Sequence, residues 1–221
     1  MCGRFTITMR PEELQREFPW VIVPSQMQPR YNIAPTQPVA VIANENPQQI
    51  DFYRWGLIPS WTKDISIGAR LINARAETLA EKPSFRHAFA RRRCLILADG
   101  FYEWTVQQKA KQPYYICLKS AKPFAFAGLW DSWQDDQGNE LRSCTIITTK
   151  ANELVSRIHE RMPVILAPEH YSLWLSKEEK RQSELSQLLV PYPAQEMIMH
   201  PISSYVNDPQ HDDAECIKPL A

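Results

Sequence analysis

Long apolar runs are absent from the 221 residues. None approaches the roughly 18 residues that a membrane-spanning helix requires, and the start, MCGRFTITMR, lacks the apolar stretch of a signal peptide. We therefore expect a cytoplasmic protein without membrane contact. Repeats, low-complexity segments and linkers are also absent, which favours one domain over 1–221, with about 208–221 as a C-terminal tail.

Paired cysteines are missing too. The five cysteines are odd in number, widely spaced and without a C-x-x-C pair, so neither a disulfide framework nor a zinc site is predicted: Cys2, Cys94, Cys117, Cys144 and Cys216. We expect no metal and no cofactor.

Excess charge is lacking, because 25 basic residues balance 25 acidic ones. An anionic partner must then be held by a local patch. Residues 82–93 contain six basic residues and no acid, whereas 208–215 form an acidic cluster. A solvated basic face explains the first segment equally well.

Aromatic residues are abundant, with seven Trp, eight Tyr and eight Phe, and indicate a packed core. Runs rich in β-branched and aromatic residues predict strands at 39–43, 50–55, 94–98, 101–104, 114–118, 124–130 and 144–149. Helical spacing occurs at 10–18, 151–158, 168–175 and 180–189, and 56–71 is the longest stretch without periodicity. The class is α+β with a mainly antiparallel sheet or barrel.

Cys2 follows the initiator methionine and has a small side chain, so removal of Met1 would expose it as a new N-terminus. Its α-amine could then add to an aldehyde as a Schiff base, and its thiol could close a thiazolidine ring. The amine would be partly neutral near pH 7, unlike that of a lysine. An ordinary second residue that happens to be cysteine is the alternative.

Polar residues interrupt several apolar segments. Burial of Glu103 would raise its pKa toward the range useful for proton transfer, although it could equally pair with an arginine. His159 follows a helical run, and lone histidines are often structural. Asn73 and Arg75, two apart on a strand, would face one side and could serve one ligand, with a buried ion pair as the alternative for Arg75.

Six ordered motifs carry a resemblance that spans Met1 to about Asn207: MCGRF, RYNIAP, RWGLIPSW, INARAET, ADGFYEW and IHERMPVIL. Together they resemble the SOS response-associated peptidase (SRAP) family of abasic-site processing proteins. The resemblance implies a single-domain α+β fold with a β-barrel-like core and flanking helices. It also implies a channel for single-stranded DNA, and a covalent thiazolidine between Cys2 and the opened sugar of an abasic site.

The resemblance further implies roles for individual residues. Cys2 is expected to be the nucleophile, Asn73 to orient its amine, and Glu103 and His159 to transfer protons. Contacts with DNA are expected from a wider set: Arg4, Asn32, Pro35, Trp61, Arg75, Trp104 and Arg161. Met1 would leave by self-cleavage or through an aminopeptidase, and the sequence does not separate the two routes.

Two other classes of function fit part of the pattern. A thiol peptidase would use Cys2 as nucleophile, His159 as base and Asn73 to orient the imidazole. A DNA-binding module without chemistry would use the aromatics and the basic segment alone. A monomer is the expected state for a protein that senses single sites.

Overall fold

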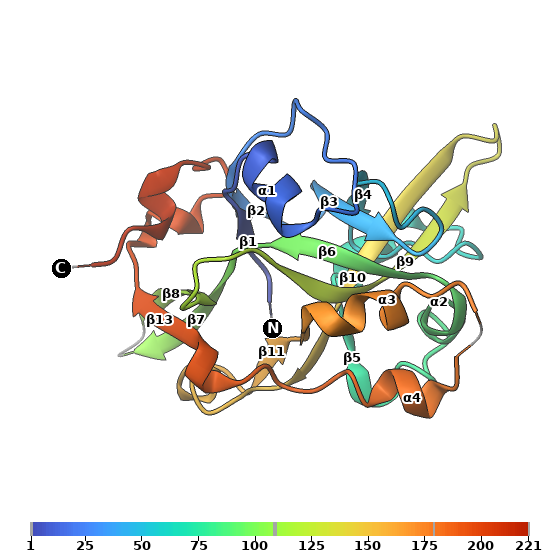
Figure 1. Cartoon of the computed structure of the whole chain (residues 1–221). Helices are drawn as coiled ribbons and strands as arrows, with labels where there is room; N and C mark the ends of the chain where they lie inside the picture. The colour runs from blue at the N-terminus through green and yellow to red at the C-terminus, as the bar shows by residue number, and fades with distance from the viewer. Residues whose placement is uncertain (1, 108–109, 179, 221) are drawn as a thin grey trace.

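The computed structural model describes residues 2–107, 110–178 and 180–220 (Figure 1). Two β-sheets dominate it, with short helices around them, so the predicted α+β class is confirmed. The first sheet and its extensions contain β3 (Pro38–Ala43), β4 (Asp51–Trp55), β5 (Asn73–Arg75), β6 (Arg93–Ala98), β9 (Phe124–Gln134), β10 (Glu140–Lys150), β11 (Arg161–Pro163) and β12 (Ile165–Leu166).

This sheet closes into a barrel. Its strands pair in the order β10, β4, β3, β6 and β9, and β9 then pairs back to β10. Closure leaves these strands without free edges. The predicted antiparallel character holds for most pairs, but β10 runs parallel to both β4 and β5.

The second sheet is antiparallel throughout, in the order β13, β8, β7, β1 and β2. Its members are β1 (Phe5–Ile7), β2 (Arg30–Ile33), β7 (Gly100–Gln107), β8 (Ala110–Leu118) and β13 (Met197–Pro201). Phe5 of β1 packs edge-on against Trp55 and Phe126 of the barrel, with ring centroids 5.1 and 5.6 Å apart. This aromatic contact joins the two sheets into one core.

Helices are shorter than the periodicity predicts. Pro11–Glu17 (α1) is confirmed, but the helix expected over 151–158 is wrong: only a 3-10 turn, Val155–Arg157, forms. The side chain of Asn152 accepts from the amides of Leu154 and Val155 and so favours a tight turn. The other short helices are α2 (Arg86–Arg91), α3 (Tyr171–Trp174) and α4 (Gln182–Ser186), with 3-10 turns at Pro168–His170, Ala76–Thr78, Ala194–Glu196, Ser204–Asn207 and Ala214–Ile217.

The stretch 56–71 is ordered by a close backbone crossing. Gly56 has φ +121°, and a Cβ placed there would lie 2.5 Å from the carbonyl oxygen of Gly68. Only glycine tolerates both conditions. Asp64 then caps the 3-10 turn Ile65–Arg70 by accepting from the amide of Ser66. Among the described residues, no helix is long and apolar enough to cross a membrane.

The basic segment 82–93 does not form the continuous patch considered above. Arg93 is fully buried, and its guanidinium donates to backbone carbonyls on 89, 90, 174 and 176. Arg92 forms an ion pair with Asp131. Two of the six basic side chains are therefore not available to a surface patch. The carbonyl acceptors offset the cost of burying Arg93.

The C-terminal residues, which the sequence assigns to a tail, pack against the second sheet. The carboxylate of Asp212 accepts from the backbone amides of Tyr31 and Asn32 and pairs with Arg30, so it covers the outer edge of β2. Cys216 is buried with Tyr102 and other apolar side chains. This docking covers an edge strand and so limits unwanted strand pairing.

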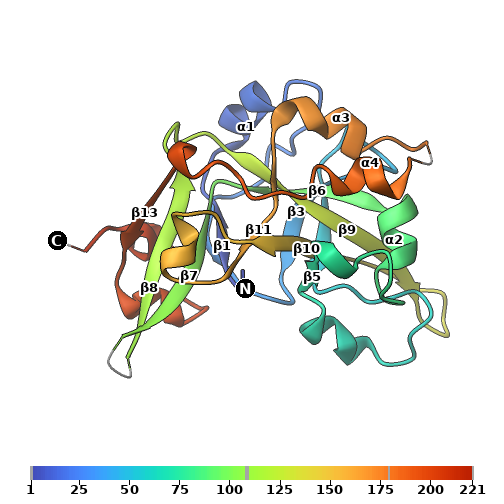
Figure 2. The same ribbon diagram turned by 90° about the horizontal axis from the view of Figure 1, so that it is seen from below.

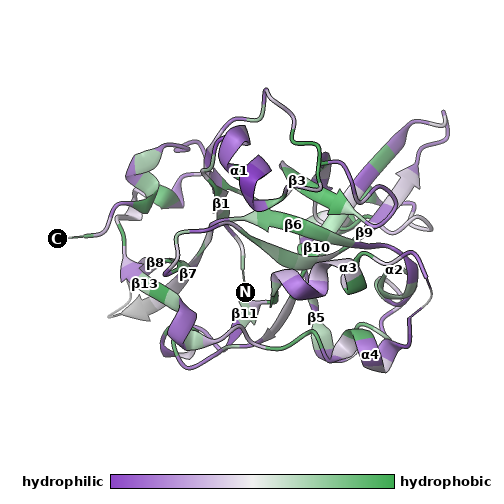
Figure 3. Cartoon of the chain, in the orientation of Figure 1, coloured by the Kyte–Doolittle hydropathy of each residue, from purple (hydrophilic) through white to green (hydrophobic). Residues whose placement is uncertain are grey.

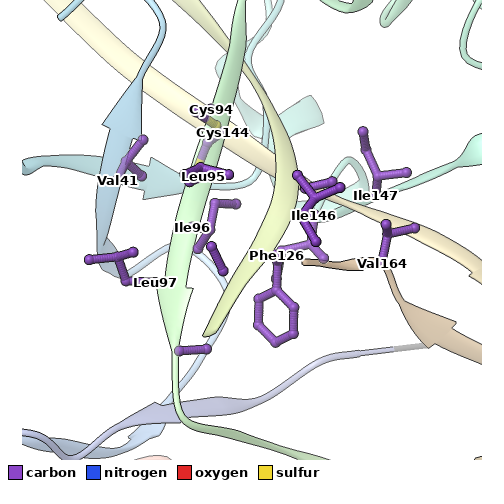
Figure 4. Packing of buried hydrophobic residues seen from close by; sticks show 14 of the residues in the cluster. Val41, Cys94, Leu95, Ile96, Leu97, Phe126, Cys144, Ile146, Ile147 and Val164 are labelled. Atoms are coloured by element: carbon purple, nitrogen blue, oxygen red, sulfur yellow. The ribbon is translucent and has the colours of Figure 1, made fainter. Parts of the chain in front are cut away.

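Strands β3 and β6 are largely hydrophobic (Figure 3), and their apolar side chains are buried. Figure 4 shows this packing around Phe126, Ile96 and Ile146. Cys94 and Cys144 lie together there, and burial raises the pKa of each thiol. All five cysteines are free thiols, as the sequence predicts.

The aromatic junction gives a stability prediction. Phe126 is fully buried and contacts Phe5, Phe101 and Phe124. We expect Phe126→Ala to lower the free energy of unfolding by about 3–5 kcal/mol, because it removes apolar contact and leaves a cavity. Phe52 is 51% exposed on the same barrel, and Phe52→Ala should change stability by no more than about 0.5 kcal/mol. Denaturant unfolding of both variants checks this, and equal losses would contradict it.

Candidate functional site

The site is built around the N-terminal strand. Cys2 precedes β1 and is buried, and its backbone carbonyl accepts a hydrogen bond of 2.8 Å from the side-chain amide of Asn73. In both views the N-terminus lies between β7 of one sheet and β5 and β11 beside the barrel (Figures 1 and 2). Cys2 is therefore held in the interior, whereas the first residues of most domains are poorly ordered.

Glu103 lies beside Cys2 because of strand register. Phe5 pairs with Phe101 and Thr6 with Gly100, so the residues before Phe5 run antiparallel to 102–104. Glu103 is 3% exposed, and burial raises the pKa of its carboxyl, an effect that nearby His159 opposes. The sequence-based expectation of a carboxyl adapted to proton transfer is supported by this direction of shift.

The thiol of Cys2 is kept protonated by the same surroundings. Burial raises its pKa most strongly, and the negative charge of Glu103 raises it further. The Sγ atom lies 3.7 Å from the carbonyl oxygen of Arg4. A thiolate is thus strongly disfavoured at Cys2 in this arrangement.

His159 reaches the site from the turn before β11. Its Nδ1 atom accepts from the backbone amide of Arg161 at 3.0 Å, which orients the ring. A neutral imidazole that accepts at Nδ1 carries its proton on Nε2. The charge of His159 lowers the pKa of the Glu103 carboxyl, so the imidazole and the carboxyl lie near each other.

Strand β5 contributes Asn73 and Arg75 on one face, since Ala74 between them is buried. The Asn73 amide oxygen has no hydrogen-bond partner among the described residues, although it is inaccessible to solvent. Arg75 is exposed, so a buried ion pair, the alternative considered for it, is not what the structure has. Asn73 and Arg75 therefore lie on the same face of β5, with Asn73 half-buried and Arg75 exposed.

Two residues expected to contact DNA form several hydrogen bonds within the protein. Arg161 donates to both carboxylate oxygens of Glu77, at 2.8 and 3.0 Å, and to the carbonyl of Thr148. Asn32 is fully buried and bonds Arg4 and three backbone carbonyls of the C-terminal segment. These bonds hold both side chains within the protein, and a direct contact of either with DNA stays a prediction.

The remaining expected contacts lie nearer the surface. Arg4 is half-buried and donates to Asn32 and to the carbonyls of Val206 and Asn207. Trp104 is partly exposed, and Pro35 is half-buried in the turn that follows β2. At least two nitrogens of the Arg4 guanidinium thus donate hydrogen bonds within the protein.

Trp61 is 61% exposed on a fixed turn. The amide of Ser60 donates to Asp131, and the indole of Trp133 donates to the carbonyl of Thr62. Trp61 borders a hollow that Arg86 and His87 also line. The turn therefore presents an aromatic face beside basic side chains.

Several residues of the site could not be singled out from sequence. Glu77 lies within the INARAET motif and partners Arg161, but an acid among arginines does not reveal which arginine it pairs with. Asn207 bonds both Arg4 and Trp104, and Asp212 covers β2. Their partners are more than 80 positions away in the chain, so no local signal exists.

Comparison with known proteins decides the family. Residues 1–209 match the SOS response associated peptidase (SRAP) family. The chain belongs to this family. The SRAP match ends at residue 209, and the segment with Asp212 and Cys216 lies beyond it.

Named relatives and solved structures agree with this assignment. The chain is 46% identical to "Abasic site processing protein YoqW" of Bacillus subtilis over 99% of both chains. It is 31% identical to "Abasic site processing protein HMCES" of Gallus gallus, covering 100% of this chain and 78% of that one. A crystal structure of a protein from Bacteroides thetaiotaomicron has a TM-score of 0.90 at 27% identity, with both chains fully covered.

The buried carboxyl of this SRAP protein gives a pH-dependent prediction. Burial raises the pKa of Glu103, so the unfolded chain releases this proton at lower pH than the folded chain, and stability falls as pH rises through that interval. We expect Glu103→Gln to raise the free energy of unfolding near pH 7, with the gain fading toward pH 4.

Glu178 is the control for this prediction. It is exposed, and its hydrogen bond with Lys180 lowers the pKa of its carboxyl, so Glu178→Gln should give no such gain. Denaturant unfolding across this pH range measures both variants. A Glu103→Gln protein that is less stable than its parent at pH 7 would contradict the assigned cause.

Proposed function

We propose that the protein processes abasic sites in single-stranded DNA and binds them covalently through Cys2 once Met1 is removed. The observation that carries this is the surroundings of Cys2: Asn73 bonds its backbone carbonyl, the Glu103 carboxylate raises the pKa of its thiol, and the charge of His159 lowers the pKa of Glu103. Relatives with the name "abasic site processing protein" at 46% and 31% identity support the substrate class.

The chemistry follows from the groups present. An abasic sugar is a hemiacetal in equilibrium with an open aldehyde, and opening it requires proton transfer, which Glu103 and His159 can provide. The α-amine of Cys2 adds to the aldehyde carbon, and loss of water gives an imine. The Cys2 sulfur then bonds that carbon while its proton passes to the imine nitrogen, which closes the thiazolidine.

Asn73 has a positioning part in this scheme. Its amide nitrogen holds the carbonyl of Cys2 at 2.8 Å, and its buried amide oxygen accepts from no donor among the described residues. A buried carbonyl oxygen without a donor is costly, and an incoming amine or sugar hydroxyl would satisfy it. Asn73 would thereby orient both the new N-terminus and the substrate.

The environment of the thiol favours this chemistry over a thiol peptidase. A peptidase nucleophile needs its thiolate stabilised by neighbouring positive charge. Here burial and the Glu103 carboxylate both raise the pKa of Cys2. A neutral thiol that transfers its proton during ring closure fits the site better, and casein should not be turned over.

Removal of Met1 is a prerequisite, because the α-nitrogen of Cys2 belongs to a peptide bond in the full chain. We assign this removal to the protein itself, since Cys2 is fully buried in the folded chain and lies near the carboxyl of Glu103. Mass spectrometry of a chain refolded without any aminopeptidase decides: persistent Met1 would exclude self-cleavage.

A single strand suits the site better than a duplex. Base pairing keeps an abasic sugar stacked between its neighbours, away from an amine at the bottom of a buried site. Exposed Arg75 offers a phosphate contact, and exposed Trp61 offers a stacking surface for a base. The protein would act as a monomer.

Replacement of Cys2 by alanine separates the two halves of the mechanism. The α-amine remains once Met1 is removed, so Cys2→Ala should still form an imine that borohydride traps on an abasic oligonucleotide. Without the thiol the imine cannot close, and an imine acidifies the neighbouring sugar carbon. We therefore expect little heat-stable adduct without reductant and more β-elimination than with the parent, measured on denaturing gels.

Two outcomes would overturn this proposal. One is a heat-stable adduct from Cys2→Ala without reductant. The other is no trapped species although mass spectrometry confirms that Met1 has been removed from that variant and that the substituted alanine is its N-terminus. A tag fused ahead of Met1 that blocks its removal is the matched control, since it should abolish both activities.

Arg75 gives an independent test of the DNA path. Loss of one phosphate contact should weaken binding of an intact single strand by about tenfold at low salt and reduce the slope of log affinity against log salt by about 0.7. The exposed Arg16 of α1 provides the control, because Arg16→Ala should leave affinity and slope unchanged. Fluorescence anisotropy at several salt concentrations measures both variants, and equal slopes would remove Arg75 from the DNA path.

A further inference from the structure

Among the described residues, few bonds attach Cys2 to the rest of the fold. The ladder between β1 and β7 ends where the amide of Tyr102 donates to the carbonyl of Arg4 at 3.0 Å. Before that point, the side-chain amide of Asn73 donates to the carbonyl of Cys2, and the guanidinium of Arg4 donates to the side chain of Asn32. The position of Cys2 relative to Glu103 therefore depends on side chains as well as on strand pairing.

Asn207 bonds to the neighbours of both catalytic groups. Its backbone carbonyl accepts from Nη2 of Arg4 at 3.2 Å, and its side-chain Oδ1 accepts from the indole Nε1 of Trp104 at 2.8 Å. Arg4 lies two residues after Cys2, and Trp104 directly follows Glu103. One residue thus connects the strand that carries the nucleophile with the strand that carries the carboxyl.

The C-terminal segment holds Asn207 in place. The preceding residue, Val206, is buried, and its carbonyl accepts from both Arg4 and Asn32. Ser203 caps the 3-10 turn Ser204–Asn207 by accepting from the amide of Tyr205. Asn207 itself is exposed, so its side chain is fixed by its bond to Trp104 and contributes little to the core.

We propose that Asn207 is a positioning residue that sets the alignment of Cys2 with Glu103 through Arg4 and Trp104. This inference rests on the proposed function. It assigns Asn207 no contact with DNA or with the reacting atoms. Its side-chain oxygen fixes the indole of Trp104, and with it the middle of β7, where the buried carboxyl of Glu103 lies.

The test compares Asn207→Ala with Asn207→Asp. Alanine removes the acceptor for the Trp104 indole, whereas aspartate keeps an oxygen at the same place. Single-turnover adduct formation on an abasic single strand should slow roughly two- to tenfold at saturating DNA in Asn207→Ala, the range expected for one hydrogen bond. The DNA concentration that gives half the maximal rate should stay the same, and Asn207→Asp should recover most of the rate.

Asn46 provides a matched control. It is also an exposed asparagine whose amide bonds a neighbour, Gln49 at 3.2 Å, but it lies on the turn between β3 and β4. Asn46→Ala should leave the rate unchanged. Thermal unfolding of all variants shows whether a slower rate reflects a damaged fold, and we expect the parent's melting temperature for Asn207→Ala.

Each failure has its own signature. A parent protein that forms no adduct refutes the proposed function together with this inference. A parent that reacts while Asn207→Ala reacts equally fast refutes the inference alone. A loss confined to the half-saturating DNA concentration, a lowered melting temperature that accounts for the loss, or no recovery in Asn207→Asp also refutes it, because each would make Asn207 a DNA contact or a purely structural residue.

Discussion

Antiparallel pairing of β1 with β7 is the constraint from which the site follows. This short strand is held on one side by Phe101 and Gly100 of β7 and on the other by β2, and Phe5 anchors it against Trp55 and Phe126 of the barrel. A three-residue strand could not hold a chain end by backbone bonds alone. Aromatic burial provides the missing stability, and the register then leaves Cys2 next to Glu103.

The interior of the fold contains several charged side chains. Three of these are Glu103, Arg161 and Arg93, and the free-energy cost of removing each from water is offset in a different way. Arg161 pairs with Glu77, and Arg93 donates to backbone carbonyls. Burial raises the pKa of the Glu103 carboxyl, and shifts of this kind are common at functional sites.

A segment near the C-terminus contacts the residues that follow Cys2. Arg4 near the N-terminus and Asn32 of β2 bond to carbonyls between 206 and 211, and Asp212 covers the free edge of β2. The C-terminal segment is therefore part of the architecture that holds the N-terminal strand. Its contribution extends past residue 209, where the family match ends.

The sequence by itself determined the α+β class, most strands and the motifs that contain Cys2, Asn73, Glu103 and His159, because alternating apolar residues and unusual polar insertions are local signals. The strands it did not predict are short, from the two residues of β12 to the five of β13, and such short runs show little periodicity. Helix 151–158 was predicted wrongly because Asn152 competes for the backbone amides. Tertiary structure alone decided that Arg161 and Asn32 face inward, that Arg93 leaves the basic patch, and that Asn207 lies against Arg4 and Trp104. Burial and partner choice depend on contacts between distant segments, which no local pattern contains.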